Sequence, residues 1–438
     1  MISHYLDDLI ENSDRILLLQ GPIGSFFTDL SEWLRTQNKT VFKINLNAGD
    51  EYFYPNSVLN TFAYRDSLEN FHHYLVSFCQ THHIDQVICF GDNRKYHKIA
   101  KKVCQSLSVG FWAFEEGYFR PNYVTFEKSG VNAYSPIPCD ATYFSQFENL
   151  PEPAKPQHVA KGFCPMAKLA IQYYVSAYYR RHHYSKYRHH RLLNVLYYVK
   201  LWSISGVKRL HYYLYDWNFA KRVEKGEFGD FFILPLQVYD DSQILVHSDY
   251  SSVEAILREV LLSFATKAPK HLRLIVKHHP MDRGFIDYGK VIDEYLEQYP
   301  ELKKRIYYIH DVPMPVFLRH GKGMVTLNST SGISALLHNM PVKTLGRANY
   351  DFAGLTYQGS LDDFWSNSEK PDDGLFNAYR KFHLHKTHIN GSFYNKVILR
   401  YPYNQSYTLT QQPVIFCKIF TKNNRFSNLF SKRSLLNA

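Results

Sequence analysis

The richest polar segment of the chain is TLNSTSG, residues 326–332, which follows an apolar run and precedes an amphipathic one. Capping a helix needs one Ser, Thr or Asn, whereas this segment gathers hydroxyls, an amide and a glycine. Backbone N–H groups at a helix N-terminus also bind anions. The segment therefore predicts a phosphate site formed by Asn328, Ser329, Thr330 and Gly332.

A second basic segment, KHHP at residues 277–280, also ends an apolar run. Lysine and histidine there suit phosphate, and proline stiffens the exit from a strand. His278 and His279 are adjacent in an extended segment and point to opposite sides, which argues against both binding one metal. A simple turn is the alternative. The candidates in this segment are Lys277, His279 and Pro280, while His310 and Asp311, which end the next apolar run, form a weaker candidate that fits a simple turn equally well.

Two pairs of adjacent acids follow other apolar runs. Asp240 and Asp241 lie in LQVYDDSQ, residues 236–243, together with Gln237. A carboxylate there suits attack on a sugar carbon or proton abstraction, and the alternative is a helix cap. Glu115 and Glu116 begin EEGYFRP, residues 115–121, where general acid–base work competes with a solvated loop.

Two segments of the first half suit an anion or an acceptor. Arg120 is a bidentate donor that matches phosphate or carboxylate. Gly21, Pro22 and Ser25 lie in GPIGS, between an apolar run and a helical pattern, where backbone N–H groups can meet an anion. A tight strand-to-helix turn is the other interpretation of GPIGS.

Alternating strand and helix patterns must position these segments. In the first half we expect strands at 15–20, 40–46, 86–91 and 109–115, with helices at 26–35, 67–80 and 96–107. After a proline-rich stretch at 116–165, expected to be irregular, and a helical stretch, the alternation resumes. Strands are expected at 231–237, 273–278, 305–310, 323–328 and 342–346, with helices at 252–265, 286–298, 312–319 and 331–338. The pattern predicts two parallel, doubly wound sheets, and the polar segments above end their strands.

Composition supports a globular protein with two basic regions. The 438 residues are 45% hydrophobic and 16% aromatic, which excludes a disordered chain, a collagen or a coiled coil. The net charge is +11, yet residues 180–225 carry +9 and residues 374–438 carry +10, so the remainder is −8. Basic regions rich in Tyr, Phe and Leu suit nucleic acid, an anionic membrane or an anionic substrate.

Several classes of protein are not expected. The sequence has no run of 18 apolar residues, so a membrane-spanning helix is not expected. The acidic N-terminus lacks the apolar core of a secretory signal. The sequence has no Walker A, HExxH or GxSxG motif. The 22 histidines lie mostly in HH pairs or basic runs, so we expect neither a metal nor a cofactor. A nucleic-acid-binding protein is disfavoured because no recognised motif for it occurs.

Taken in order, five segments resemble the capsule polysaccharide biosynthesis proteins of Gram-negative bacteria. They are QGPIGSFF, FEEGYFRPNYVTFEKSGVNAYS, LPLQVYDDSQI, KHHP and LNSTSGISALLHNMPVKTLGRANYDFAGLT. The match runs from about residue 15 to about 365 and is most similar to the single-module, S-type branch. This resemblance implies an α/β fold with two Rossmann-like domains of the GT-B type and a basic helical insert.

The resemblance also implies an activity and its partners. S-type proteins are retaining β-Kdo transferases that use CMP-Kdo, without a metal, to start a poly-Kdo linker on phosphatidylglycerol or its lyso form. Such an enzyme would act on the cytoplasmic face of the inner membrane, beside a C-type capsule Kdo transferase and the capsule export machinery. No nucleic-acid partner is expected.

Residue roles follow from the same resemblance. Asp241 is the candidate nucleophile, with Asp240 second, and Glu116 is the candidate acid–base, with Glu115 second. The expected domains are an acceptor domain at 1–165, the insert at 166–228, a CMP-sugar domain at 229–375 and a basic tail at 376–438 that packs back on the N-terminal half. Two alternatives stay open, a transferase of this fold that uses another nucleotide sugar and a non-catalytic export or assembly component. CMP-Kdo carries a phosphodiester and a carboxylate, and its expected contacts are Gln237, Lys277, His279, Pro280, His310, Asp311, Asn328, Ser329, Thr330 and Gly332.

Overall fold

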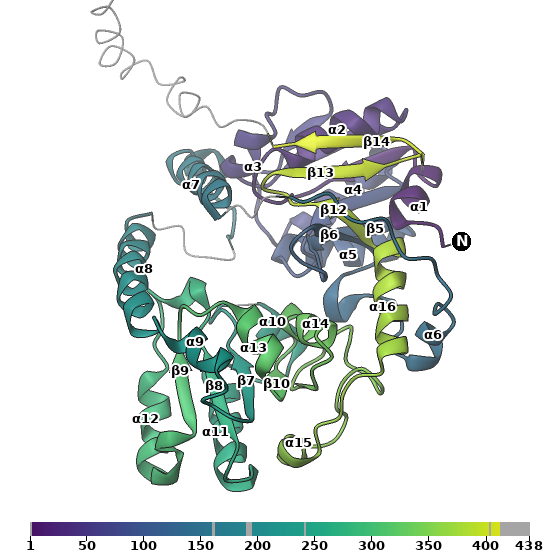
Figure 1. Cartoon of the computed structure of the whole chain (residues 1–438). Coiled ribbons are helices and arrows are strands. Elements are labelled where there is room, and N and C mark those ends of the chain that lie inside the picture. The colour runs from purple at the N-terminus through teal and green to yellow at the C-terminus, as the bar shows by residue number, and fades with distance from the viewer. Residues whose placement is uncertain (1, 160–162, 190–194, 241, 403, 412–438) are drawn as a thin grey trace, which may run out of the picture. The chain divides into compact units, whose positions relative to one another are not determined.

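The computed structural model describes residues 2–159, 163–189, 195–240, 242–402 and 404–411 (Figure 1). The chain divides into two compact units. The N-terminal unit takes residues 6–115, 157–195 and the described chain from 389 onward, and the C-terminal unit takes residues 1–5, 116–156 and 196–388. Each unit has a parallel sheet with helices, so the expected α/β class with two Rossmann-like units is confirmed.

The parallel strands of the N-terminal unit have the order β3-β2-β1-β4-β5 within a nine-stranded sheet. Buried apolar side chains dominate β1, β4 and β5, as expected of a sheet covered on both faces, whereas the edge strand β3 is only half-buried. The strands are β1 (Arg15–Leu18), β2 (Thr40–Asn45), β3 (Thr61–Ala63), β4 (Gln86–Phe90) and β5 (Gly110–Glu116). The helices are α1 (Tyr5–Glu11), α2 (Phe26–Thr36), α3 (Ala48–Phe53), α4 (Phe71–Thr81) and α5 (Lys95–Leu107).

The chain returns to this unit near its end, through three strands that the sequence did not predict. They are β12 (His388–Gly391), β13 (Lys396–Arg400) and β14 (Ser406–Thr410). β13 pairs antiparallel with both neighbours, and Val397 lies opposite Leu409. Strand β14 also packs against α2. Residues 412–438 of the basic tail lie outside the described residues.

The sheet of the C-terminal unit is entirely parallel, in the order β11-β10-β7-β8-β9. Its strands are β7 (Phe231–Pro235), β8 (Arg273–Lys277), β9 (Ile306–Ile309), β10 (Gly323–Thr326) and β11 (Val342–Thr344). Counted along the chain, both units have the order 3-2-1-4-5. This order reverses direction between β7 and β10, and ligands of doubly wound sheets bind beside the carboxyl ends of such a strand pair.

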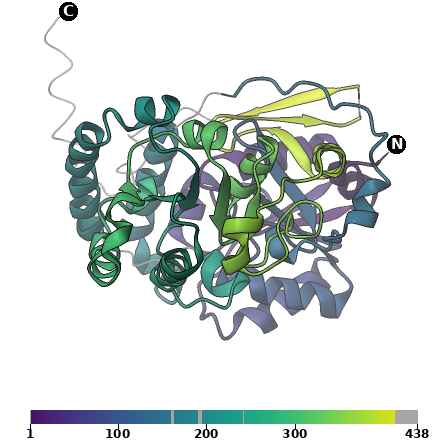
Figure 2. The ribbon, with the colours of Figure 1, turned by 60° about the horizontal axis from the view of Figure 1, so that its bottom comes forward.

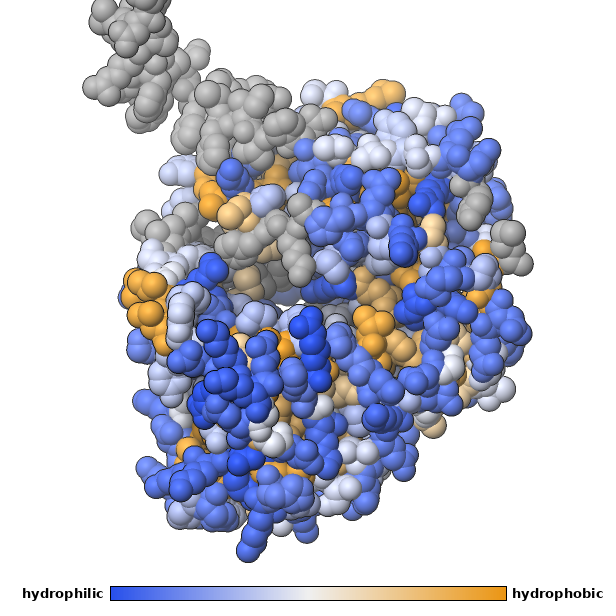
Figure 3. Space-filling view, in the orientation of Figure 1, coloured by the Kyte–Doolittle hydropathy of each residue, from blue (hydrophilic) through white to orange (hydrophobic). Residues whose placement is uncertain are grey.

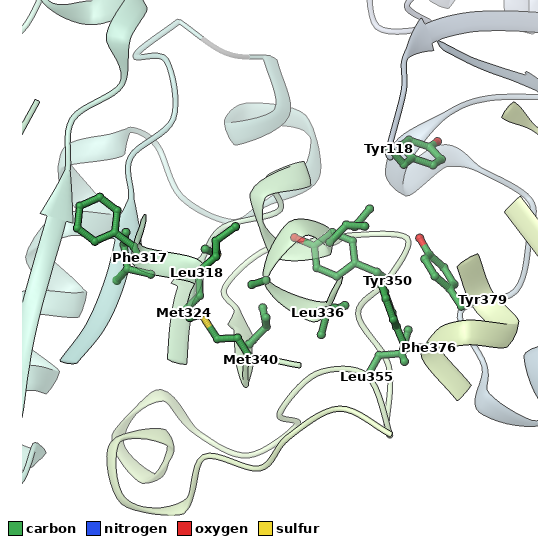
Figure 4. Close-up of a cluster of buried hydrophobic side chains, with 14 of the residues drawn as sticks. Tyr118, Phe317, Leu318, Met324, Leu336, Met340, Tyr350, Leu355, Phe376 and Tyr379 are labelled. Carbon is green, nitrogen blue, oxygen red and sulfur yellow. The ribbon is translucent and has the colours of Figure 1, made fainter. Parts of the chain in front are cut away.

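Two hydrophobic clusters cover the two faces of this sheet. Neighbouring residues of β7 point to opposite sides, so Phe231 and Ile233 join one cluster, whereas Phe232 and Leu234 join the other. Figure 4 shows part of the first cluster around Tyr350 and Tyr379. The surrounding helices, seen from a second side in Figure 2, are α10 (Ser242–His247), α11 (Val253–Lys267), α12 (Gly289–Gln298), α13 (Met314–His320), α14 (Thr330–Leu337), α15 (Leu361–Asn367) and α16 (Asp373–Lys386).

The stretch at 116–165 is not simply irregular, which corrects that expectation. It contains β6 (Tyr123–Lys128), the 3-10 turn η1 (Asn132–Tyr134) and α6 (Ala141–Ser145). β6 is a short run between prolines, and four of its six residues are buried. Pairing with other strands, rather than a local period, therefore defines it.

The expected insert is helical, and the two compact units share it. Helix α7 (Phe163–Tyr179) and the 3-10 turn η2 (Arg181–Tyr184) belong to the N-terminal unit, where Arg180 pairs with Glu51 at 2.6 Å. The described part of α8 (Val195–Tyr215) from residue 196 onward and α9 (Phe219–Glu224) belong to the C-terminal unit.

Candidate active site

Most of the predicted site residues lie just after strands of the C-terminal sheet, at one edge of that sheet. Pro235 pairs with Lys277, and Lys277 pairs with Ile309, so β7, β8 and β9 end side by side. In the parallel neighbour β10, Met324 pairs with Ile233, which brings the start of α14 to the same edge. The structure thus gathers the segments that follow four strands.

The strand pair where the order reverses is joined by a direct side-chain contact. The Gln237 Nε2 group after β7 donates to Asn328 Oδ1 after β10 at 3.0 Å. Asn328 Nδ2 in turn donates to the carbonyl of His247 at 3.4 Å. Gln237 Oε1 is buried and accepts no hydrogen bond from any residue that the structure describes. A ligand donor, such as an amine or hydroxyl, would satisfy this oxygen.

Lys277 places a positive charge at this edge. The residue is 7% exposed, and no described side chain or carbonyl accepts a hydrogen bond from its ammonium group. Burial, and after it the charge of Arg283, lower the pKa of Lys277 to about 8 against the opposing effect of Asp311 and Asp216. Lys277 is therefore still mostly protonated at pH 7 and lacks a directly bonded anion.

His279 offers a neutral N–H donor beside this lysine. Its Nδ1 accepts a hydrogen bond from the backbone N–H of Met281 at 3.2 Å, so the ring proton resides on Nε2. Burial lowers the pKa of His279 to about 4, with smaller contributions from Lys277, His278 and Arg120. The charge of Arg120 therefore acts on this edge, in the same unit as the predicted phosphate site. Its own Nε donates to the carbonyl of Gly117 at 3.2 Å.

The segment after β9 is held by α8. Asp216 Oδ2 accepts the backbone N–H groups of both His310 and Asp311, each at 2.8 Å. The His310 ring stacks on Tyr212, with centroids 3.6 Å apart and planes 2° from parallel. Asp311 forms an ion pair with Arg283. The Asp311 carboxylate is thus already engaged with a cation.

The His310 ring is buried, and neither of its nitrogens bonds to a residue that the structure describes. Burial lowers the pKa of His310 to about 3, with His278 contributing next. The neutral imidazole thus holds an N–H and a lone pair that no described residue satisfies, beneath this edge.

At the start of α14, Ser329 uses backbone N–H groups that could otherwise bind an anion. Ser329 Oγ accepts the backbone N–H of Ser331 at 3.1 Å and so caps the helix. A side chain at Gly332 would place its Cβ 2.4 Å from the Tyr350 hydroxyl, which donates to the Ser329 carbonyl at 2.6 Å. Thr330 begins the helix and is partly exposed. The Ser331 and Gly332 N–H groups are both bonded to Ser329, the latter at 2.9 Å, which leaves the Thr330 N–H as the donor for an anion.

The structure describes Asp240 but not Asp241. Asp241, the first candidate nucleophile, lies outside the described residues. Asp240 is exposed in the turn after β7, where the backbone N–H of Tyr239 donates to Asp282 Oδ2 at 2.8 Å. Pro280, at the exit of β8, is exposed and begins the short turn η3 (Pro280–Asp282).

The two glutamates end β5 and belong to different units. Glu115 lies in the N-terminal unit, where its Oε2 is 3.7 Å from the position that a Cβ would take at Gly91. Glu116 lies in the C-terminal unit with Asp240 and Lys277, and its carbonyl accepts from Thr125 Oγ1 at 3.4 Å. Adjacent strand residues point to opposite sides, which agrees with the expectation that one acid of the pair serves a given site.

The predicted anion contact in GPIGS has mainly internal partners. Pro22 is buried, and Ser25 Oγ donates to Asp29 Oδ2 at 2.8 Å. A Cβ at Gly21 would lie 2.8 Å from the Phe27 ring. These contacts in the N-terminal unit favour the tight-turn interpretation of this segment.

Several residues of the edge escaped the sequence analysis. Tyr212, Asp216 and Arg283 hold the segment after β9, and the ring of Tyr134 lies 4.5 Å from that of His247. Asp216 has one signal in the sequence, because it is the first acid after Glu152. Among the residues that the structure describes, no group of three His, Cys, Asp or Glu side chains is arranged to hold a metal ion.

Comparison with known proteins decides the family. Residues 85–394 match the model of a family described as capsule polysaccharide biosynthesis protein. The chain belongs to this family. It is 51% identical over 418 residues to the capsule polysaccharide modification protein LipB of Neisseria meningitidis serogroup B, covering 95% of this chain and 99% of that one. It is also 39% identical over 380 residues to the capsule polysaccharide export protein KpsS of Escherichia coli, covering 87% and 97%.

Solved structures also resemble this member of the capsule family. One is the beta Kdo 2,7 transferase of Thermosulfurimonas dismutans KpsC, at 14% identity and a TM-score of 0.38, covering 84% of this chain and 99% of that one. Within the described part of the chain, no helix is long and apolar enough to cross a bilayer.

Proposed function

We propose that this capsule-family protein is a retaining β-Kdo glycosyltransferase. It would transfer Kdo from CMP-Kdo to a phosphatidylglycerol or lysophosphatidylglycerol acceptor and so start the poly-Kdo linker of a capsular polysaccharide. The reaction would need no metal and would take place on the cytoplasmic face of the inner membrane. A C-type Kdo transferase would extend the product before the capsule export machinery receives it. Family membership and the capsule-related names of the relatives support this setting.

The observation that carries the proposal is the edge of the C-terminal sheet around Lys277. A buried ammonium without a bonded anion, the Nε2–H of His279 and the Thr330 N–H at the start of α14 all suit a phosphodiester. Gln237 and His310 add buried polar atoms that no described residue satisfies at the same edge. CMP-Kdo has a phosphodiester and a carboxylate, so its charges match this set of donors.

The proposed chemistry is a double displacement. Asp241 attacks the anomeric carbon of Kdo, and the bond from that carbon to the phosphate oxygen breaks with its electron pair remaining on CMP. Lys277 and the His279 N–H stabilise the negative charge that develops on the leaving phosphate. The acceptor hydroxyl then displaces Asp241 while Glu116 takes its proton, and two inversions retain the anomeric configuration.

Mass spectrometry of the product from purified protein, CMP-Kdo and a short-chain phosphatidylglycerol tests this proposal. We expect the lipid to gain the mass of Kdo and CMP to be released in equal amount. Other nucleotide sugars offered in place of CMP-Kdo test the first alternative. A protein that binds lipid or polysaccharide but transfers no sugar from any donor would instead support the export or assembly role.

A matched pair of lysine variants connects the activity to the proposed site. Lys277→Met should bind CMP at least tenfold more weakly, whereas Lys303→Met, which changes an exposed lysine before β9 at the other end of the sheet, should leave the affinity unchanged. Equal CMP affinity in both variants would refute the assignment of the donor site.

A further inference from the structure

Helix α8 has one face that is fixed by contacts within its unit. Its half-buried or buried positions recur every three or four residues, at Tyr198, Leu201, Ser205, Lys208, Tyr212 and, just beyond the helix, Asp216. The Tyr198 ring lies 6.4 Å from that of Phe285, and a Cβ at Gly284 would lie 2.3 Å from the Leu201 carbonyl. Together with the Asp216 contacts after β9, these interactions determine which side of α8 faces outward.

The opposite face of α8 is apolar and exposed. Val207, Leu210 and Leu214 are 74%, 65% and 65% exposed and follow one another at spacings of three and four residues, so they form a single stripe. Figure 3 shows apolar residues at the surface over α8. Exposed aromatic side chains flank the stripe, at Tyr197, Trp202, Tyr213, Tyr215 and Trp217. Monomeric proteins rarely expose so continuous an apolar surface without a partner for it.

The charge around this stripe is positive. No acidic residue occurs between Glu152 and Asp216, whereas α8 carries Lys200, Lys208 and Arg209. Lys200 and Arg209 are exposed. An aliphatic stripe with aromatic flanks and exposed cations is typical of a helix that lies in the interface of an anionic bilayer. Tyr and Trp favour this depth because each has an apolar ring and a polar group.

We propose that α8 is an interfacial membrane helix, whose stripe of Val207, Leu210 and Leu214 enters the outer acyl region of an anionic bilayer. The aromatic flanks then lie at headgroup depth, and the exposed Lys200 and Arg209 contact lipid phosphates. The inference rests on the proposed function for its biological setting, while the lipid contact is a separate property that vesicles test without turnover. Composition alone indicates that the basic regions are attracted to an anionic membrane. The α8 proposal adds that apolar side chains insert into the bilayer.

The test is co-sedimentation of the full-length protein with vesicles of phosphatidylglycerol and phosphatidylcholine, compared with phosphatidylcholine alone. The variant is Leu210→Glu combined with Leu214→Glu. The matched control is Leu59→Glu combined with Leu262→Glu, which adds the same charge at leucines that are 73% and 47% exposed elsewhere. Unchanged circular dichroism and CMP affinity show that each variant remains folded.

We expect the α8 double variant to bind anionic vesicles at least a hundredfold more weakly, because each inserted leucine contributes about tenfold or more. The control should bind like the wild type. Wild-type binding should also weaken with salt without disappearing, since insertion is not screened. Equal binding by both double variants would overturn the proposal.

Two further outcomes identify a different occupant. A wild-type dimer that the α8 variant converts to a monomer, with vesicle binding unchanged, would assign the stripe to a second copy of the chain and overturn the proposal. If the wild type binds vesicles only when another protein is present, and the α8 variant does not, the stripe would be assigned to that protein. This outcome would also overturn the proposal. Transfer to a water-soluble glycerol phosphate acceptor separates the two hypotheses: lipid binding without any transfer would refute the proposed function and leave the role of α8 standing.

Discussion

Lys277→Met should make the free protein more stable while it removes the donor site. Burial holds the pKa of Lys277 at about 8, against 10.5 for an ordinary lysine. Below pH 8 the folded protein bears the full cost of this buried charge, and a difference of two to three pKa units corresponds to about 3 kcal/mol. Methionine has a similar length and no charge, so the variant should gain free energy of unfolding of this order at pH 7.

The sign of the pH dependence follows from the same shift. Between pH 8 and about 10.5 the unfolded chain binds a proton at Lys277 that the folded protein has released, so this contribution to stability rises with pH. The difference between the variant and the wild type should therefore be largest at pH 7 and should decline toward pH 10. Urea unfolding at several pH values measures it, with Lys303→Met as the exposed control.

Donor binding should respond in the opposite direction. A phosphate next to Lys277 stabilises its charged form, so CMP binding requires a protonated lysine. Above the pKa of about 8 the affinity should fall, reaching about tenfold weaker at pH 9 than at pH 7. Calorimetry checks this, and Lys277→Met should bind weakly at both values. CMP affinity that is the same at pH 7 and pH 9, or a variant that is less stable than the wild type at pH 7, would refute this reasoning.

Three other predictions concern the same edge and the chemistry. Asp216→Ala removes the acceptor of two 2.8 Å backbone contacts and should lower the free energy of unfolding in urea by about 3 kcal/mol and weaken CMP binding. Asp216→Asn should restore part of the stability and part of the CMP affinity. Gly332→Ala forces a Cβ against Tyr350 and should cost about 1–3 kcal/mol, whereas Gly206→Ala on α8, with nothing within 4 Å, should be neutral or stabilising. Asp241→Ala should keep CMP binding and abolish transfer, Glu116→Gln should slow transfer by about 10²–10⁴-fold, and Asp240→Ala should be milder, as product mass spectrometry would show. An Asp241→Ala enzyme that retains near wild-type turnover would exclude Asp241 as the nucleophile.

The alternation of strands and helices was readable from the sequence because it depends on local patterns. Short apolar runs such as those of β1 and β7 predict buried parallel strands, and both form. The gathering of KHHP and LNSTSG at one sheet edge was also predictable, since parallel strands end at the same side. Sequence therefore determined the fold class and most of the candidate phosphate contacts.

Tertiary structure alone decided which distant residues meet. Tyr212 in α8 and Asp216 just after it belong to a stretch that the sequence treats as an insert, yet they hold the segment after β9. Strands β12 to β14 have weak local signals. They pair with one another, and β14 packs against α2, which lies about 370 residues earlier in the chain. Likewise, only packing of one face of α8 revealed its other face as an exposed apolar stripe. Local propensity describes one segment at a time, whereas burial and partner choice depend on the whole folded chain, and these decide the site and its surfaces.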